Sequence, residues 1–484
     1  MSSETKKSGI GAFDFFCIGF GAIVGVGWAL RLNNWMAGSG GPIPAASGYI
    51  MCLIIMVPVA LCYCELVPMM PVAGGGAAFA YKAFGQHISF ISGWAAFGGF
   101  VWIIPWEAIY VCNIASYMFP ALQAGDPLYV IAGEGVYLQQ LILGSVCSLL
   151  LFYANWRGLK TSATVQRFLC VILIAVGLMA MILALFKFDP ANLTPVYEHV
   201  GRGSHNSFFG GMMAIMLTAP FFLAGFETIP QGVEDAKGSI TSVGKTVVLA
   251  VGCACLFYAG VLFCLGGAMP WQDFYAGGQF GTPAAGILLK TVYGGGFGQT
   301  LWTILTLGAL CGLVTTWNGF MIASPRLLMG MARANLIPKV LATQNPKTGV
   351  PTVALTCCFV LSFIGPFLGM GLIDPITEFA GTAYVLSWAI TAFSVVKLRK
   401  SEPDTPRPYK IPGGPATAWF AGLVMSIFFV CFFIPGTPVK LDSLTTQIFI
   451  GWAILGAVLY LGTAPQRNKI PLEERVAALF DPKR

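Results

Sequence analysis

Long apolar runs separated by short polar segments constrain this 484-residue chain more than any other feature. A run of about 20 apolar residues is long enough to cross the hydrocarbon core of a bilayer as a helix. Only 10% of the residues are charged and 56% are hydrophobic, which leaves too few charges for the surface of a soluble protein. We therefore expect an all-α polytopic membrane protein with twelve transmembrane helices. The expected spans are 11–37, 46–70, 87–119, 136–155, 162–186, 206–232, 243–268, 297–331, 352–371, 374–397, 415–434 and 444–463.

The distribution of positive charge predicts the orientation of the chain in the membrane. Cytoplasmic segments of membrane proteins carry an excess of Lys and Arg. An even number of spans puts both termini on one side, and all but five of the 27 Lys and Arg residues fall on that side, with Lys6, Lys7, Lys483 and Arg484 at its termini. We therefore expect a protein of the cell membrane with both termini in the cytoplasm. The five exceptions are Arg31, Lys187, Arg202, Lys290 and Lys440.

The sequence offers little basis for metal or enzyme chemistry. It has three His, and it lacks the H-E-x-x-H and C-x-x-C patterns that hold zinc. Most of its 14 Cys lie inside apolar runs, where a free Cys behaves as a small hydrophobe. No nucleophile lies beside a base in a pattern typical of an enzyme. We expect no catalytic residue, no metal, no cofactor and no nucleic-acid partner, because membrane topology explains the positive charge.

Two of the expected spans contain residues that interrupt a helix. Gly weakens a helix and Pro removes a backbone donor, and unpaired backbone at membrane depth is tolerated only where it lines a cavity or is buried in protein. Span 1 holds four glycines between positions 19 and 27, and span 6 holds Pro220, Gly225 and Pro230. Close helix packing through small residues is the alternative explanation for either span alone.

Gly25 and Gly225 occupy matching positions in two halves of five spans each. Interrupted segments at matching positions of two halves indicate a transport site near the middle of the membrane, and their exposed helix ends suit a zwitterion. Because five is odd, the halves have opposite orientations. We predict a five-plus-five inverted repeat with broken helices 1 and 6. The expected segments are a cytoplasmic N-terminus (1–10), a first repeat with helices 1–5 (11–187), a second repeat with helices 6–10 (188–397), a linker with helices 11 and 12 (398–463) and a cytoplasmic tail (464–484).

Six short motifs, in order along the chain, give it a family resemblance. They are Gly21–Gly27 in span 1, Glu65–Gly75 with Ala83–Gly85 between spans 2 and 3, Arg157–Ala163 at the entry to span 5, Phe221–Glu227 in span 6 with the acidic loop Glu234–Lys237 after it, Ser324–Arg326 with Met331–Pro338 at the end of span 8, and Arg407–Pro412 before span 11. The chain resembles permeases of the amino acid–polyamine–organocation superfamily. The resemblance covers nearly the whole chain and implies a secondary transporter that works by alternating access.

The resemblance also implies a substrate site at the two breaks. The backbone of span 1 would hold a substrate carboxylate, and the backbone of span 6 would hold its amine. The substrate-binding candidates are Ile23, Val24, Gly25, Val26, Gly27, Phe221, Phe222, Ala224 and Gly225. The aromatic candidates for a gate or cavity wall are Trp28, Trp106, Phe221 and Phe226.

Three of the charged residues inside the expected spans are candidates for charge selection or proton coupling, because ionisable groups within a membrane are costly and often functional. Glu227 falls on a position that the resemblance ties to the pH response, and its alternative role is a hydrogen bond that locks the helix. Arg31 and Glu107 both belong to the outer half of the membrane. They either pair with each other structurally or select charged groups of the substrate.

The coupling ion and the substrate stay open at this stage. Some superfamily members carry in span 5 a Lys that replaces a sodium ion, but residues 161–186 hold no Lys, and Leu173 takes its place. Thr315 and Thr316 in span 8 are candidate sodium ligands. Proton coupling, sodium coupling and exchange are therefore all compatible with the sequence. The protein is expected to be a monomer or a homodimer. The preferred substrate is an amino acid or small organic amine. The alternatives are a transporter of a quaternary or simple amine such as choline or ethanolamine, a transporter-like nutrient sensor and a channel.

Overall fold

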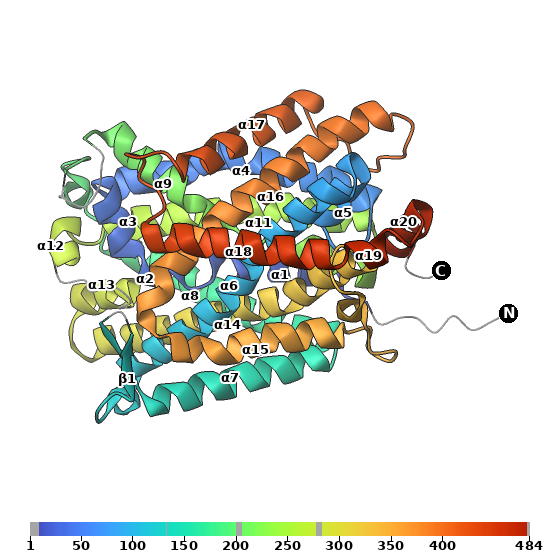
Figure 1. Cartoon of the computed structure of the whole chain (residues 1–484). Coiled ribbons are helices and arrows are strands. Elements are labelled where there is room, and N and C mark those ends of the chain that lie inside the picture. Colours follow the sequence, from blue (N-terminus) through green and yellow to red (C-terminus); the bar gives the residue numbers. More distant parts are fainter. Residues whose placement is uncertain (1–8, 132, 200–205, 277–282, 482–484) are drawn as a thin grey trace.

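Helices make up nearly all of the described chain (Figure 1). The computed structural model describes residues 9–131, 133–199, 206–276 and 283–481. Five basic residues that entered the predicted orientation, and most of segment 1–10, lie outside the described residues. These are Lys6, Lys7, Arg202, Lys483 and Arg484.

The first half of the chain, to residue 193, holds eight helices and one small hairpin. They are α1 (Ala12–Val24), α2 (Gly27–Leu30), α3 (Leu32–Ser39), α4 (Pro42–Met69), α5 (Gly76–Phe84), α6 (Gln86–Met118), β1 (Tyr129–Ile131), β2 (Glu134–Val136), α7 (Leu138–Trp156) and α8 (Leu159–Phe186). The antiparallel pair of β1 and β2 connects α6 with α7. Short 3-10 helices lie at Pro120–Gln123 and Pro190–Leu193.

The second half holds twelve further helices in its described parts. They are α9 (Phe208–Leu223), α10 (Thr228–Gln231), α11 (Ile240–Gly266), α12 (Trp271–Ala276), α13 (Ala284–Tyr293), α14 (Gly295–Arg333), α15 (Thr352–Leu368), α16 (Ile373–Ser401), α17 (Pro415–Cys431), α18 (Ser443–Gly462), α19 (Ala464–Arg467) and α20 (Leu472–Phe480). Short 3-10 helices lie at Val233–Asp235, Lys339–Ala342 and Met370–Leu372.

The lengths of the apolar helices confirm a polytopic membrane protein. Within the described ranges, ten helical segments are long and apolar enough to cross a bilayer. Two shorter apolar helices, α15 and α17, have 17 residues each and coincide with the expected spans 9 and 11. Seventeen residues are at the lower limit for a membrane crossing. The total of twelve therefore stays a prediction.

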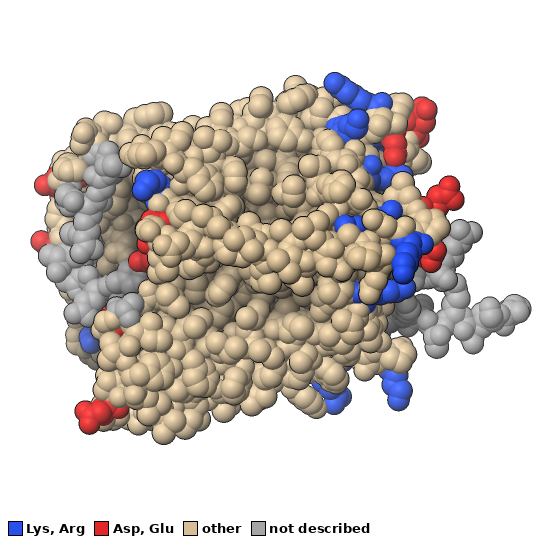
Figure 2. Space-filling model, viewed as in Figure 1, with Lys and Arg blue, Asp and Glu red and all other residues tan. Residues whose placement is uncertain are grey.

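The bundle buries some helices and presents others to lipid. The spans that contain α1, α6 and α16 are mostly buried, whereas less than a third of the apolar stretch is buried in the spans that contain α7, α8 and α18. The exposed helices carry large apolar side chains on the outer surface, including Leu150, Phe168 and Leu461. A continuous apolar surface of this kind suits lipid tails rather than water. Figure 2 shows that charged side chains gather at the two ends of the bundle, and that Lys and Arg concentrate at the end with α5, α19 and α20, called here the basic end. The opposite end carries α3 and α12.

Spans 1 and 6 are interrupted, as the glycines and prolines predict. Span 1 consists of α1, α2 and α3, with Gly25 and Val26 between the first two helices. Span 6 consists of α9 and α10, with residues 224–227 between them. Hydropathy did not predict α5, α13 or the hairpin, because these elements are too short to appear as spans.

Candidate functional site

The break in span 1 is built around Gly25. This residue has φ +43° and ψ −132°, a conformation that only glycine adopts without strain. A Cβ at this position would overlap the hydroxyl of Thr316 on α14. The Tyr258 hydroxyl on α11 lies 2.9 Å from the carbonyl oxygens of both Ile23 and Val24 and can donate its one proton to either. This bond satisfies one of the acceptors that the end of α1 leaves free.

The break in span 6 is built around Gly225, which has φ +127°. Its N–H donates to Oε2 of Glu227 at 2.9 Å, and its carbonyl accepts from the Thr228 hydroxyl at 2.5 Å. A Cβ on Gly225 would lie 2.7 Å from the carbonyl carbon of Ala22 and 2.8 Å from the amide nitrogen of Ile23. The two breaks therefore touch through their backbones, and only glycine permits this approach.

A small central cavity lies between the two breaks. Its volume is about 30 Å³, which is room for about two water molecules. Only one charged side chain, Glu107 on α6, lines it. The other lining residues are Ala22, Ile23, Val24, Gly25, Val26, Gly27, Ile103, Trp106, Phe221, Phe222, Ala224, Tyr258 and Thr316.

A larger vestibule of about 360 Å³ lies beside α3, toward the opposite end from the basic end. Phe221 and Phe222 line both the vestibule and the central cavity, so their rings form the partition between them. Trp106 supports this partition, with its ring centroid 5.8 Å from that of Phe221. Its Nε1 donates to the Thr377 hydroxyl at 3.1 Å. The vestibule residues that carry charge are Arg31, Asp374 and Glu378.

Most of the residues predicted to bind substrate meet at the central cavity. The candidates on the lining are Ile23, Val24, Gly25, Val26, Gly27, Phe221, Phe222, Ala224, Trp106, Glu107 and Thr316. Gly225 lies directly behind it, against the backbone of α1. Two aromatic candidates lie in packed layers instead. Trp28 is fully buried and packs edge-on against Phe257, and Phe226 is fully buried between Tyr63 and Trp388.

Glu227 bonds across the helix break instead of lining the cavity. Its Oε2 accepts from the Gly225 N–H, and its Oε1 accepts from Nε1 of Trp388 on α16 at 3.0 Å. The side chain is 3% exposed. The carboxylate therefore joins the break to α16. This contact fits one of the two roles considered for Glu227 in the sequence, a hydrogen bond that locks the helix; the other role was a proton site.

Arg31 pairs with Asp374 rather than with Glu107. The Nη2 of Arg31 lies 3.2 Å from Oδ1 of Asp374 at the start of α16, and both residues line the vestibule. Among the described residues Glu107 enters no ion pair, and its Oε2 has no hydrogen-bond partner. Its side chain is 2% exposed. The pairing with Asp374 could not be predicted from the sequence, because Asp374 lies 343 positions from Arg31.

Thr315 and Thr316 bring two hydroxyls to one carbonyl of α1. Their Oγ1 atoms lie 3.0 and 3.2 Å from the carbonyl oxygen of Gly21 and also within hydrogen-bond distance of that of Gly312, and each hydroxyl can donate its one proton to either oxygen. The Leu173 side chain lies close by, because a Cβ on Gly312 would meet its Cδ1 at 3.0 Å. Within the described chain, no group of three or more His, Cys, Asp or Glu residues could hold a metal ion.

Sequence reasoning missed three cavity residues, Ala22, Ile103 and Tyr258. Ile103 sits one helical turn before Glu107 and therefore shares its face. Tyr258 carries the only phenol in the long apolar helix α11, and a buried hydroxyl in such a helix needs an acceptor. The need of the Tyr258 hydroxyl for an acceptor was the feature of the sequence that could have indicated its role at the break.

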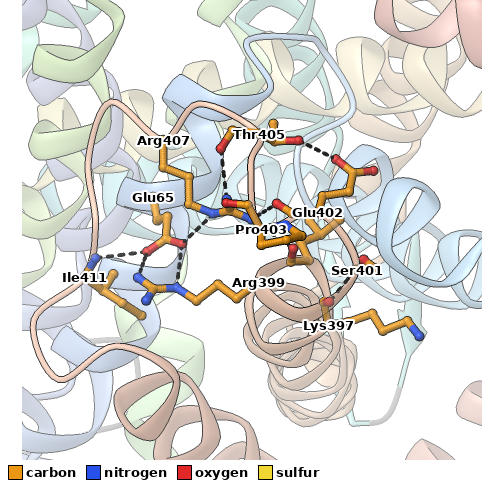
Figure 3. A network of polar contacts seen from close by, with 10 residues as sticks. Glu65, Lys397, Arg399, Ser401, Glu402, Pro403, Thr405, Arg407 and Ile411 are labelled. Carbon is orange, nitrogen blue, oxygen red and sulfur yellow. Dashed lines mark hydrogen bonds and ion pairs between the residues drawn. The ribbon is translucent and has the colours of Figure 1, made fainter.

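A polar network closes the basic end (Figure 3). Glu65 near the end of α4 accepts from Nε and Nη2 of Arg399 at 2.9 and 2.6 Å, and from the N–H of Ile411 at 2.9 Å. The Nε of Arg407 lies 3.5 Å from its Oε1. The Glu65 side chain is 1% exposed. The carboxylate therefore ties α4 to α16 and to the linker that follows α16.

A second set of contacts at the basic end joins span 6 to the loop after α4. Glu234 accepts from the N–H of Ala73 at 2.8 Å and pairs with Nη1 of Arg333 on α14 at 2.6 Å. Gln231 on α10 accepts from the N–H of Gly74 at 3.0 Å. These contacts hold α10 against α14 and the α4–α5 loop.

A helical bundle with a small cavity between two broken helices, a vestibule toward one end and a polar network at the other is typical of a membrane permease. Comparison with known proteins agrees. The chain matches the amino acid permease family over residues 10–459. It therefore belongs to that family, and the predicted superfamily resemblance is confirmed.

Three relatives illustrate the range of the family. A branched-chain amino acid permease, BcaP, of Bacillus subtilis (strain 168) is 24% identical over 96% of this chain and 95% of its own length. A methylthioribose transporter of the same organism is 24% identical over 95% of each chain. The vacuolar cationic amino acid transporter 4 of Arabidopsis thaliana is 25% identical over 82% of this chain and 64% of its own length. All three are named as permeases or transporters, which agrees with the prediction that the chain is not an enzyme.

Proposed function

We propose that the protein is a secondary transporter that moves an amino acid or small organic amine across the cell membrane by alternating access. The observation that carries the proposal is the close approach of Gly225 to Ala22 and Ile23, beside the central cavity that Gly25 lines. Broken backbone at membrane depth is stable where it lines a ligand site. The family match supports an amino acid as the substrate.

The substrate would bind between the two breaks. Backbone around Ile23, Gly25 and Gly27 would hold a carboxylate, and backbone around Phe222 and Ala224 would hold the amine. These residues all line the cavity. Because 30 Å³ is smaller than an amino acid, the rings of Phe221 and Phe222 would have to move to admit it from the vestibule.

Two closures would alternate in the cycle. The Arg31–Asp374 pair and the two Phe rings stand on the vestibule side, and the Glu65 and Glu234 contacts stand at the basic end. The described arrangement has a vestibule on one side and a closed polar network on the other. It corresponds to a state that would take substrate from the vestibule.

The proposed architecture is a twelve-helix chain with a five-plus-five inverted repeat. Its support is the packing of corresponding spans, since α4 packs on α11, α6 on α14 and α7 on α15. Elements related by a two-fold axis that passes between them are expected to touch in this way. The concentration of Lys and Arg at the basic end favours a cytoplasmic location for that end and for both termini.

The relatives leave several substrates and couplings open. Branched-chain amino acids, methylthioribose and cationic amino acids all occur in the names of relatives with nearly equal identity. Sodium coupling would use the hydroxyls of Thr315 and Thr316 near the Gly21 carbonyl, and proton coupling would use Glu227. A quaternary or simple amine is the second candidate substrate. The aromatic rings of Trp106, Phe221 and Phe222 around the cavity favour it, because such rings attract organic cations.

Transport by purified protein in liposomes tests the proposal. We expect uptake or exchange of at least one labelled amino acid or amine, with a dependence on a pH or sodium gradient, or on internal substrate, that identifies the coupling. Liposomes without protein and liposomes with heat-denatured protein are the controls. A complete lack of uptake and exchange over a panel of all amino acids and simple amines would refute the proposal.

A further inference from the structure

We propose that Glu107 makes the central cavity selective for substrates with a net positive charge: a simple amine without a carboxylate, or an amino acid with a second amino group. The inference rests on the proposed transport function and names the substrate class of the same site. Glu107 lies on α6 and faces the break at Gly25–Gly27 across a cavity of about 30 Å³.

The first support is that, in the described part of the chain, no hydrogen-bond donor reaches Oε2 of Glu107. Each other polar side chain on the lining is committed elsewhere. The Tyr258 hydroxyl donates to the backbone of α1, Trp106 donates to Thr377, and Thr316 donates to a carbonyl of α1 or α14. A buried carboxylate without a donor is costly inside a membrane protein. A ligand with an ammonium group supplies the missing donor.

The second support is the charge balance of the occupied site. Among the lining residues Glu107 is the only charged one. A zwitterion brings equal positive and negative charge, so with an ionised Glu107 the occupied cavity would carry a net charge of −1 and would hold two carboxylates close together. Like charges at short range in a low dielectric repel strongly. A substrate with a net charge of +1 makes the occupied cavity neutral.

The third support is the charge of the entrance. The vestibule is lined by two acidic side chains, Asp374 and Glu378, and by one basic side chain, Arg31. Asp374 is 66% exposed and faces the water of the vestibule. The acidic side chains outnumber the basic one, and an excess of one sign of charge in a cleft raises the local concentration of the opposite ion. The entrance therefore favours cations, as the cavity does.

Binding to the purified full chain in detergent, measured with two matched ligand pairs, tests the inference. Leucine and 3-methylbutylamine share a skeleton and differ by the carboxylate. Norleucine and lysine share a chain length and differ by the terminal ammonium group. In the wild type we expect the cationic member of at least one pair to bind at least tenfold more tightly, and which pair responds tells a simple amine from a diamino acid.

The variant Glu107→Gln keeps the shape of the side chain and removes its charge. We expect it to reduce the cation preference to less than threefold, whereas Glu107→Asp keeps the preference with weaker binding. Glu474→Gln makes the same chemical change on the exposed face of α20 and should leave the preference intact. Tighter binding of leucine and norleucine by the wild type, or an unchanged preference in Glu107→Gln, would overturn the inference. If liposomes transport zwitterions and no cations, only this inference fails; if they transport nothing, the proposed function fails.

Discussion

The Glu65 carboxylate offers the sharpest test of the interactions that hold the basic end together. Glu65→Gln keeps the volume of the side chain and removes its charge. Arg399 and Arg407, whose side chains are 19% and 5% exposed, would then lose their buried counter-ion. Removing one partner of a buried ion pair costs about 3–5 kcal/mol. Because Arg399 keeps some contact with water, we expect destabilisation near the lower value, about 3 kcal/mol.

Equilibrium unfolding of the purified protein in mixed detergent micelles, followed by tryptophan fluorescence, measures this loss. Glu402→Gln is the matched control, because Glu402 lies in the same region and pairs with Lys82 at 3.0 Å in a more exposed setting. An exposed pair contributes about 0–1 kcal/mol. A double-mutant cycle that combines Glu65→Gln with Arg399→Gln should give an interaction energy of about 0.5–3 kcal/mol between the two side chains. The reasoning would be refuted if Glu65→Gln lowered the free energy of unfolding by no more than Glu402→Gln does. It would also be refuted if the effects of Glu65→Gln and Arg399→Gln were additive.

Two further predictions concern the broken helices. Gly25→Leu should abolish substrate binding while the protein still inserts, because φ +43° and the Thr316 hydroxyl leave no room for a side chain; Gly252→Ala, with open space around it, is the control. Normal binding by Gly25→Leu would remove the break from the site. Glu227→Gln should flatten the pH dependence of uptake by liposomes, whereas Trp388→Phe, which keeps the carboxyl group, should preserve it. An unchanged pH profile in Glu227→Gln would exclude Glu227 as the proton carrier.

The membrane helices and their breaks could be predicted because the bilayer imposes simple rules on the sequence. Lipid requires each span to satisfy its own backbone, so apolar length identifies α4, α8 and α11, and glycine identifies the break after α1. The short elements could not be predicted, because they are not long enough to give a signal in hydropathy. The apolar helix α13 is 10 residues long and is buried by its neighbours, so its stability comes from tertiary contacts that hydropathy does not report.

Side-chain direction and distant partners could not be predicted from the sequence. Trp28 lies three residues after Gly25, yet the turn at the break directs its ring into the packed layer beside Phe257. Phe226 lies next to Gly225 and likewise faces away from the cavity, toward Trp388. A residue beside a helix break turns through an angle that depends on the backbone torsions there. Position along the chain therefore identified the site but not which of its aromatic residues line it.

The two ends of the bundle differ in what holds them closed, and the difference bears on the proposed cycle. At the basic end the Glu65 carboxylate is 1% exposed and lies against two guanidinium groups, whereas Asp374 at the vestibule is 66% exposed and, among the described residues, pairs with one, that of Arg31. The buried carboxylate also accepts a backbone hydrogen bond from Ile411, whereas an exposed ion pair contributes about 0–1 kcal/mol. In the proposed cycle we therefore expect the contact at the vestibule to open before the network at the basic end. A ligand reverses such a bias only by the difference in its affinity for the two states, and about 5.5 kcal/mol moves a population from 1:99 to 99:1. A cationic group that neutralises Glu107 when the cavity closes around it is a source of that difference, because the neutralised carboxylate stabilises the occupied state and not the empty one.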